Sequence, residues 1–192
     1  MQNGLMSELD AVNKILAVAG DSPVQTLEDE YVQAKLARQI LVRASRKIQS
    51  MGWWFNEEEE VNLIPDIDGY LTLATNVISV TALDDIGGIV QRGNRIYNRA
   101  ERTYVFQQPV KVDLVLALEW NELPQSAREY ITDVACTQYN NDFFGAQELK
   151  SSLKANEDAS YLILKAGDLE SRDVNMLRNS RAYNIAFRNR RG

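Results

Sequence analysis

A single long amphipathic segment constrains the fold of this chain more than any other feature. From Thr26 onward, no glycine or proline occurs until Gly52. Small or apolar side chains recur here at three- or four-residue steps, as one face of a helix requires. They are Tyr31, Ala34, Ala37, Ile40, Leu41, Ala44, Ile48 and Met51. Because Thr26 suits a helix start and Gly52 a left-handed helix end, the sequence predicts one helix of about seven turns, around which the other segments pack.

Three aromatic residues, Trp53, Trp54 and Phe55, follow directly behind the predicted end of this helix. Side chains of this size are usually buried in the core, and they form a ligand platform less often. We therefore expect the three residues to be the core anchor of the helix, with at least one tryptophan packed against its apolar face. Truncating a fully buried tryptophan would destabilise the fold by roughly 3–5 kcal/mol.

The segments on either side of the long helix also have clear patterns. Ser7 and Asp10 form a start like a capping box for a first helix that ends at Gly20. Helix is predicted again after Pro124, followed by a last helix that runs from about Ala146 either to Gly167 or, with a break at Gly167, on to Met176. The last helix has only a weakly apolar face, which is more typical of a partner-facing helix than of a deep core helix. That face comprises Leu149, Leu153, Asn156, Ala159, Ser160 and Ile163.

Between these helices, turn residues divide the chain into short pieces rich in β-branched and aromatic residues. The pieces are 61–64, 70–74, 77–83, 89–91, 95–97, 103–106 and 110–118. Gly93 and Asn94 are expected at the tip of a hairpin, in a turn with positive φ angles. The predicted fold class is thus α+β: a four-helix-type bundle of two N-terminal and two C-terminal helices, with a small inserted antiparallel β region. The expected divisions are 1–60 (N-terminal helices), 61–120 (β region), 121–176 (C-terminal helices) and 177–192 (basic extended tail).

Several classes of chemistry are disfavoured by what the sequence lacks. There is no histidine, which removes the commonest general base and zinc ligand, and neither of the usual glycine-rich phosphate motifs occurs. The one cysteine, Cys136, cannot form an internal disulfide and is expected as a small apolar residue on a helix. Glycoside hydrolysis needs two carboxylates across the scissile bond, but the consecutive Glu57–Glu60 are expected to repel one another and stay solvated. We therefore expect no catalytic residue, cofactor or metal.

The charge of the chain is unevenly distributed. The net charge is −6, and residues 177–192 carry five arginines and no carboxylate, so residues 1–176 carry −11. This tail is expected either to be frayed or to be a docking arm, because arginine binds carboxylates and phosphates in two-pronged fashion. The residues assigned to docking are Arg178, Arg181, Tyr183, Phe187, Arg188, Arg190 and Arg191. No apolar run is long enough to cross a membrane, so no membrane anchor is expected.

Three blocks of the sequence carry a resemblance to a known family. They are A-V-N-K-I-L-A-V-A-G-D-S-P-V-Q-T-L-E (11–28), R-K-I-Q-S-M-G-W-W-F-N-E-E-E (46–59) and N-N-D-F-F-G-A-Q-E (140–148). In this order they resemble the tail tubular protein A family of T7-like short-tailed bacteriophages, also called the adaptor or gatekeeper of the tail. The resemblance does not extend clearly into the β region or beyond about Leu164.

The resemblance implies a structural protein of the virion tail that is synthesised soluble in the host cytoplasm. It implies a twelve-subunit ring that joins the portal to the nozzle protein, helps to hold the tail fibres and lets genomic DNA pass without specific binding. An acidic body suits such a channel, because it repels phosphate, and the arginine tail would then reach the portal. One alternative is a tail-borne hydrolase of envelope glycans that uses Glu57–Glu60 or Asp84 and Asp85. Another is nucleic-acid binding through the arginine tail, which the acidic body opposes.

Overall fold

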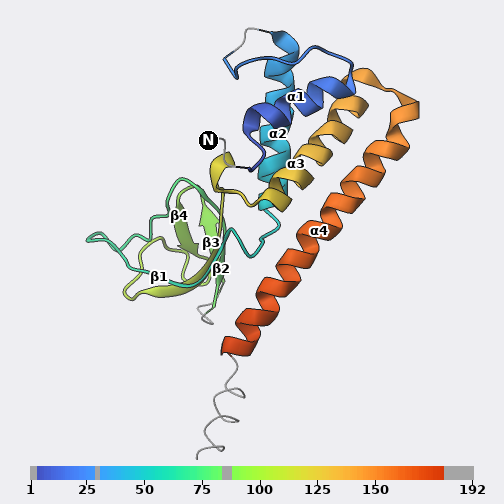
Figure 1. Ribbon diagram of the computed structural model, residues 1–192. Coiled ribbons are helices and arrows are strands. Elements are labelled where there is room, and N and C mark those ends of the chain that lie inside the picture. Colours follow the sequence, from blue (N-terminus) through green and yellow to red (C-terminus); the bar gives the residue numbers. More distant parts are fainter. Residues whose placement is uncertain (1–3, 29–30, 84–87, 180–192) are drawn as a thin grey trace, which may run out of the picture. The chain divides into compact units, whose positions relative to one another are not determined.

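The protein was analysed as a computed structural model that describes residues 4–28, 31–83 and 88–179 (Figure 1). The helices are α1 (Glu8–Val18), α2 (Val32–Gln49), α3 (Gln125–Tyr139) and α4 (Gln147–Asn179), with short helical turns η1 (Trp120–Glu122) and η2 (Asn140–Phe144). The strands are β1 (Glu57–Leu63), β2 (Val77–Ala82), β3 (Ile89–Arg92), β4 (Arg95–Asn98) and β5 (Val110–Leu116). These elements confirm the α+β class. The chain divides into a helical unit, residues 1–41 with 124–192, and a β unit, residues 42–123.

In the helical unit, α3 packs against both α1 and α4. The predicted capping box at the start of α1 is present: the Ser7 hydroxyl accepts from the Asp10 amide (3.1 Å), and the Asp10 carboxylate accepts from the Ser7 amide (2.9 Å). The hydrogen bonds from Ser7 hold the pKa of Asp10 below its ordinary value. Lys14 of α1 forms an ion pair with the buried Asp133 of α3 (2.6 Å), which ties these two helices together.

Helix α2 begins six residues later than the sequence predicts, at Val32 instead of Thr26. The cause is a competing set of tertiary hydrogen bonds just upstream. The Asn13 amide group accepts from the backbone N–H of Val24 (2.8 Å) and donates to its carbonyl (3.0 Å), and Val24 is buried. This contact holds the connection that follows α1 in a non-helical conformation. A tertiary contact therefore outweighs the local helix propensity of the segment before Val32.

Helix α4 continues through Gly167, so the predicted break there is wrong. Asp168 next to this glycine is buried, and its carboxylate pairs with Arg172 (3.0 Å) and, at a longer distance, with Lys165 (3.8 Å). These pairs link successive turns on both sides of the glycine. The helix extends to Asn179, so residues 177–179, expected in the extended tail, are helical.

The β unit contains an antiparallel sheet in the order β1-β5-β2 and the separate hairpin β3–β4. Its core is a cluster of seven buried residues: Leu71, Leu73, Ile96, Phe106, Val110, Val112 and Leu114. The predicted hairpin is confirmed, with Arg92 opposite Arg95, but a positive φ (63°) is recorded only for Gly93 of its two tip residues. The predicted strands at 70–74 and 103–106 form only isolated bridges, such as Tyr70 with Val105. Their backbone groups are partly bonded to loops instead, as in the bond from the Leu73 amide to the Asn94 carbonyl (2.8 Å).

Candidate assembly surfaces

The aromatic residues behind α2 lie in two different environments. Trp53 is 4% exposed, and its indole N–H donates to the carbonyl of Ile48 (2.8 Å) in the last turn of α2. Trp54 and Phe55 are half-buried and contact each other edge to face, with ring centroids 5.0 Å apart. Trp53 is therefore the deeply packed side chain of the three, and its polar atom is satisfied at the end of the helix.

Two buried polar side chains, Gln49 and Asn56, join the end of α2 to the end of β5. Gln49 accepts from the amide of Leu118 (2.7 Å) and donates to its carbonyl (3.1 Å). Asn56 accepts from the Trp53 amide (2.9 Å) and donates to the carbonyls of Gln49 (2.9 Å) and Leu116 (2.7 Å). Both side chains are 2% exposed, so these bonds are shielded from water.

We call Gln49, Trp53 and Asn56 the clasp. Sequence reasoning identified only the tryptophan, because a buried amide is indistinguishable from a surface amide in a periodicity pattern. One usable signal was present: Gln49 follows the buried Ile48 directly, which places a polar residue at the edge of the apolar stripe of α2. The clasp makes the β unit a rigid platform at its junction with α2, since each buried polar group of the clasp has a partner.

Of the carboxylates proposed for a hydrolase, Glu58–Glu60 do not have the surroundings of a catalytic acid. Glu58, Glu59 and Glu60 are exposed on β1, and Glu60 pairs with Lys111 (3.0 Å). Asp84 and Asp85 lie outside the described residues. Within the described parts of the chain, no cluster of three or more His, Cys, Asp or Glu could hold a metal ion. A general acid of a glycosidase needs a pocket that raises its pKa, and exposed glutamates have none.

Cys136 is buried on α3, as expected for a small apolar residue. Burial raises the pKa of its thiol to about 12, so the reactive thiolate is scarce at neutral pH. Among residues 4–28, 31–83 and 88–179, no helix combines the length and the apolar character needed to cross a membrane.

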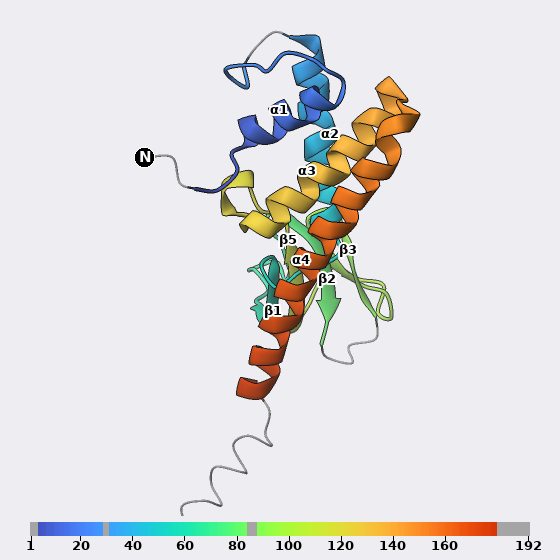
Figure 2. The ribbon, with the colours of Figure 1, turned by 45° about the vertical axis from the view of Figure 1, so that its right-hand side comes forward.

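Within the described residues, helix α4 has one buried face and an opposite face that is exposed. Ser160, Leu164 and Asp168 are buried on one face of α4, and α4 runs beside α3 (Figure 2). On the opposite face, exposed apolar residues follow one another at alternating four- and three-residue steps, the spacing of a seam that packs against another helix. We call this set the α4 stripe: Ala155, Ala159, Leu162, Ala166 and Leu169.

The α4 stripe is apolar, and its two leucines are largely exposed. Leu162 and Leu169 are 66% and 53% exposed. Beside them, Lys154 pairs with Glu157 (2.8 Å) and Asp158 (2.9 Å) within the same helix. The face predicted for this helix mixed both surfaces, since it included the buried Ser160 together with the exposed Ala159 and Ile163.

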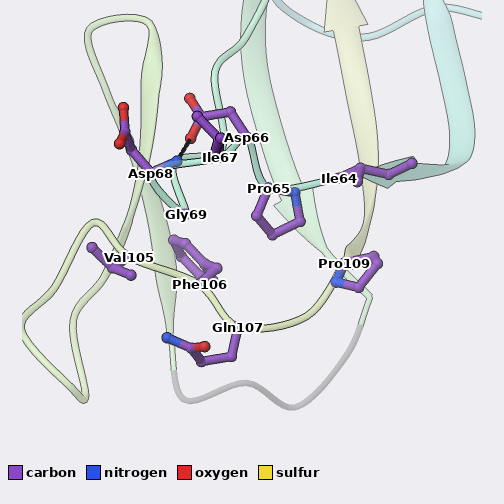
Figure 3. Close-up of a pocket in the computed structure, with 10 residues that line it drawn as sticks. All are labelled: Ile64, Pro65, Asp66, Ile67, Asp68, Gly69, Val105, Phe106, Gln107 and Pro109. Atoms are coloured by element: carbon purple, nitrogen blue, oxygen red, sulfur yellow. Dashed lines mark hydrogen bonds between the residues drawn. The ribbon is translucent and has the colours of Figure 1, made fainter.

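A shallow hollow of about 460 Å³ lies at one loop of the β unit (Figure 3). The loop 64–69 forms one wall, and Val105 to Pro109 form the other. The Asp66 carboxylate accepts from the amides of Asp68 (3.0 Å) and Tyr70 (2.8 Å), which fixes the loop while Ile67 is fully exposed. The hollow is open and its exposed lining is more polar than apolar, so it lacks the enclosed, mostly apolar character of a typical substrate pocket.

The arginine tail is mostly beyond what the structure describes. Arg178 lies in the last turn of α4. The other predicted docking residues, Arg181, Tyr183, Phe187, Arg188, Arg190 and Arg191, lie outside the described residues. Their assignment to a docking arm stays a prediction from the sequence.

Comparison with known proteins places these surfaces in context. A profile of the family described as "Tail tubular protein" matches residues 9–174, which include both units. The chain belongs to the tail tubular protein family. A curated member, tail tubular protein A of Klebsiella phage KP34, is 30% identical over 161 residues, which cover 83% of this chain and 86% of that protein. Membership of the tail tubular protein family thus identifies the chain as a structural phage tail protein, in agreement with the resemblance carried by its helices and aromatic motif.

Proposed function

We propose that this tail tubular protein is the adaptor, or gatekeeper, of a short phage tail. In this role twelve copies form a ring beneath the portal, join it to the nozzle protein, help to hold the tail fibres and leave a channel for genome ejection. Family membership supports a tail role, and the ring with its partners follows from the resemblance to T7-like adaptors. The protein performs no chemistry of its own.

The α4 stripe is the observation that carries this proposal. Burying one exposed leucine contributes about 1.5–3 kcal/mol, so Leu162 and Leu169 offer a substantial gain that the described chain does not use. The three alanines between and beside them allow another helix to approach closely. The inward face of α4 is already packed on α3, so the stripe fits contact with a neighbouring subunit. We propose that in the ring the four helices act as one four-helix-type bundle.

The remaining assignments concern the partners of the ring. The five arginines of residues 177–192 suit a carboxylate-bearing surface of the portal. Residues 1–176, with a net charge of −11, suit a channel wall that repels the phosphates of passing DNA. Trp53 with Trp54 and Phe55 would anchor the frame that holds these surfaces, so none of the three is proposed to contact a ligand.

The mass of the assembled particle tests the proposal. Native mass spectrometry of the full chain, alone and mixed with its portal protein, is expected to show a closed ring of about twelve copies. A chain that stays monomeric even with the portal present would contradict the adaptor function. Replacing Glu57–Glu60 by glutamine is expected to leave any trace glycan cleavage unchanged, because Glu58, Glu59 and Glu60 are exposed and lack the pocket of a glycosidase.

A further inference from the structure

The β3–β4 hairpin carries a basic and aromatic surface that belongs to neither the α4 stripe nor the clasp. Arg92, Arg95, Arg99 and Arg102 fall within eleven residues, in a β unit that is acidic overall, with twelve Asp or Glu and eight Lys or Arg in residues 42–123. Two of these arginines stack on tyrosines from different segments. We call Arg92, Arg95, Tyr70, Tyr97 and Tyr104 the plate.

The geometry of the plate orients its arginines. The Cζ atom of Arg92 lies 3.7 Å from the ring centroid of Tyr97, and that of Arg95 lies 4.2 Å from the centroid of Tyr70. Tyr104 packs edge-on against Tyr97, with centroids 4.8 Å apart. A guanidinium stacked on a ring keeps its N–H donors in the plane of the group, where they can bind both oxygens of a carboxylate. Stacking therefore reduces the rotamer entropy that an arginine loses on binding.

Two features show that the plate lacks an anion within the described chain. Arg92 and Arg95 are direct cross-strand partners, and like charges at such positions destabilise a hairpin. Within the described parts of the chain, neither guanidinium forms an ion pair. The alternation of β4 buries Ile96 and Asn98, which leaves Arg95 and Tyr97 on the outer face. An anion bound between the two arginines would relieve their repulsion.

The edge of the sheet supplies the complementary charge. Strand β1 is an edge strand, because the sheet order is β1-β5-β2. Glu58 and Glu59 are exposed on it, at a bulge that interrupts the pairing with β5 between Glu58 and Val61. Carboxylates on a strand edge are a common protection against pairing with other strands. They are also the anions for which a fixed pair of arginines is suited.

We propose that the plate of one copy binds the Glu58–Glu59 edge of a second copy. The partner is a protein carboxylate and not a nucleic acid, because the net negative charge of the β unit repels a phosphate backbone at long range. The plate and the β1 edge are different surfaces of the same unit, so the contact is head-to-tail, the type that forms a ring when the rotation between neighbouring copies closes. This inference rests on the proposed ring and assigns a second contact to it, beside the α4 stripe.

A charge exchange tests the pairing in the full chain. Arg92→Glu with Arg95→Glu, and separately Glu58→Arg with Glu59→Arg, are each expected to raise the protein concentration for half-assembly about tenfold at low salt. Combining all four substitutions in one chain is expected to restore assembly, because every copy then carries both partners with exchanged signs. Native mass spectrometry measures the assembled fraction, with the portal added if the wild-type ring requires it.

The matched control is Arg43→Glu with Arg46→Glu, which makes the same charge change at two exposed arginines of α2 that also belong to the β unit. It is expected to shift half-assembly by less than about twofold, the scale of an isolated surface charge. Arg92→Gln with Arg95→Gln is the milder variant, should the glutamates disturb the hairpin. Hydrogen exchange in β5 reports whether each variant keeps its fold.

The outcomes separate this inference from the proposed function. If the wild type forms rings and the plate variants assemble equally well, the pairing is wrong and the adaptor function stands. The same conclusion follows if the chain that carries all four substitutions fails to regain assembly. If the wild type forms no ring even with the portal, both fail. If the plate variants lose affinity for a DNA duplex, with steep salt dependence, while assembly is unchanged, the plate is a nucleic-acid site and the pairing is wrong.

Discussion

The outer surfaces of the two units differ in the kind of contact that they offer. In the helical unit, the α4 stripe is apolar and regularly spaced, and Lys154 beside it is paired with Glu157 and Asp158 of the same helix. In the β unit, the plate is charged, and its arginines are held by tyrosines instead of carboxylates. Apolar contacts mainly supply affinity, whereas charged contacts mainly set orientation and partner choice. In the proposed ring, the α4 stripe would therefore supply most of the affinity and the plate would set the orientation of neighbouring subunits.

Trp53→Ala is expected to lower stability the most, because it removes the buried indole of the clasp from the β unit that carries the plate. Losing a fully packed indole and its hydrogen bond should destabilise the β unit by roughly 3–5 kcal/mol. Hydrogen exchange measured separately for β5 and α3 would show the loss in the first region more than in the second. Trp54→Ala is the matched control, and an equal loss for both variants would contradict the central role of Trp53.

Leu162→Glu with Leu169→Glu places two charges in the α4 stripe and so tests the apolar contact of the helical unit. The two side chains are exposed, so folding is expected to be unchanged, while half-assembly should require about a hundredfold more protein, equivalent to about 2.7 kcal/mol. Sedimentation velocity measures the assembly, and circular dichroism measures the fold. Val32→Glu changes another exposed apolar helix residue of the same unit and should assemble normally. Rings that tolerate both glutamates would exclude the α4 stripe as a contact.

Asn56→Ala tests how much the buried hydrogen bonds of the clasp contribute to the stability of the β unit. It leaves the Trp53 amide and the carbonyls of Gln49 and Leu116 without the partners seen in the structure. Because buried unpaired groups are unfavourable, we expect a loss of about 2 kcal/mol in the β unit. Urea titration followed by hydrogen exchange in β5 would measure it. Asn62→Ala, at an exposed position of β1, should have little effect on the free energy of unfolding. An equal loss in the two variants would show that water replaces the hydrogen bonds made by Asn56.

Ser7→Ala is expected to have the smallest effect and to be confined to the helical unit. Losing a helix cap of this kind typically lowers stability by about 1 kcal/mol. The pKa of Asp10 is lowered in the folded state, so its stabilisation is present above the ordinary value of 3.8 and is lost as pH falls through the lower folded value. Thermal unfolding at pH 7 and pH 3 should therefore show a smaller difference between wild type and variant at pH 3. A constant difference would mean that Asp10 does not take part.

The sequence correctly predicted those features that depend on interactions between residues close together along the chain. The Ser7 cap, the hairpin at Gly93 and the α+β class followed from short-range patterns. Long-range bonds could not be anticipated in the same way. The late start of α2 depends on Asn13 contacting Val24, eleven residues away, and the clasp depends on Gln49 reaching Leu118, sixty-nine residues away.

The candidate surfaces were foreseen only in part. The weakly apolar character of the last helix indicated a partner-facing role, but periodicity alone could not separate the residues facing α3 from those of the α4 stripe. The plate was not foreseen, because the stacking of Arg95 on Tyr70 joins segments whose order in space the sequence does not reveal.

The position of Cys136 has a consequence for durability. A phage particle spends long periods in oxygenated water, where no cellular reductant repairs sulfur. An accessible thiol repeated around a ring would cross-link neighbouring subunits or be oxidised step by step to acids. The single thiol of this chain, on Cys136 of helix α3, is buried, and burial raises its pKa to about 12. Burial and the raised pKa therefore slow oxidation and cross-linking at this sulfur, because the reactive thiolate is scarce.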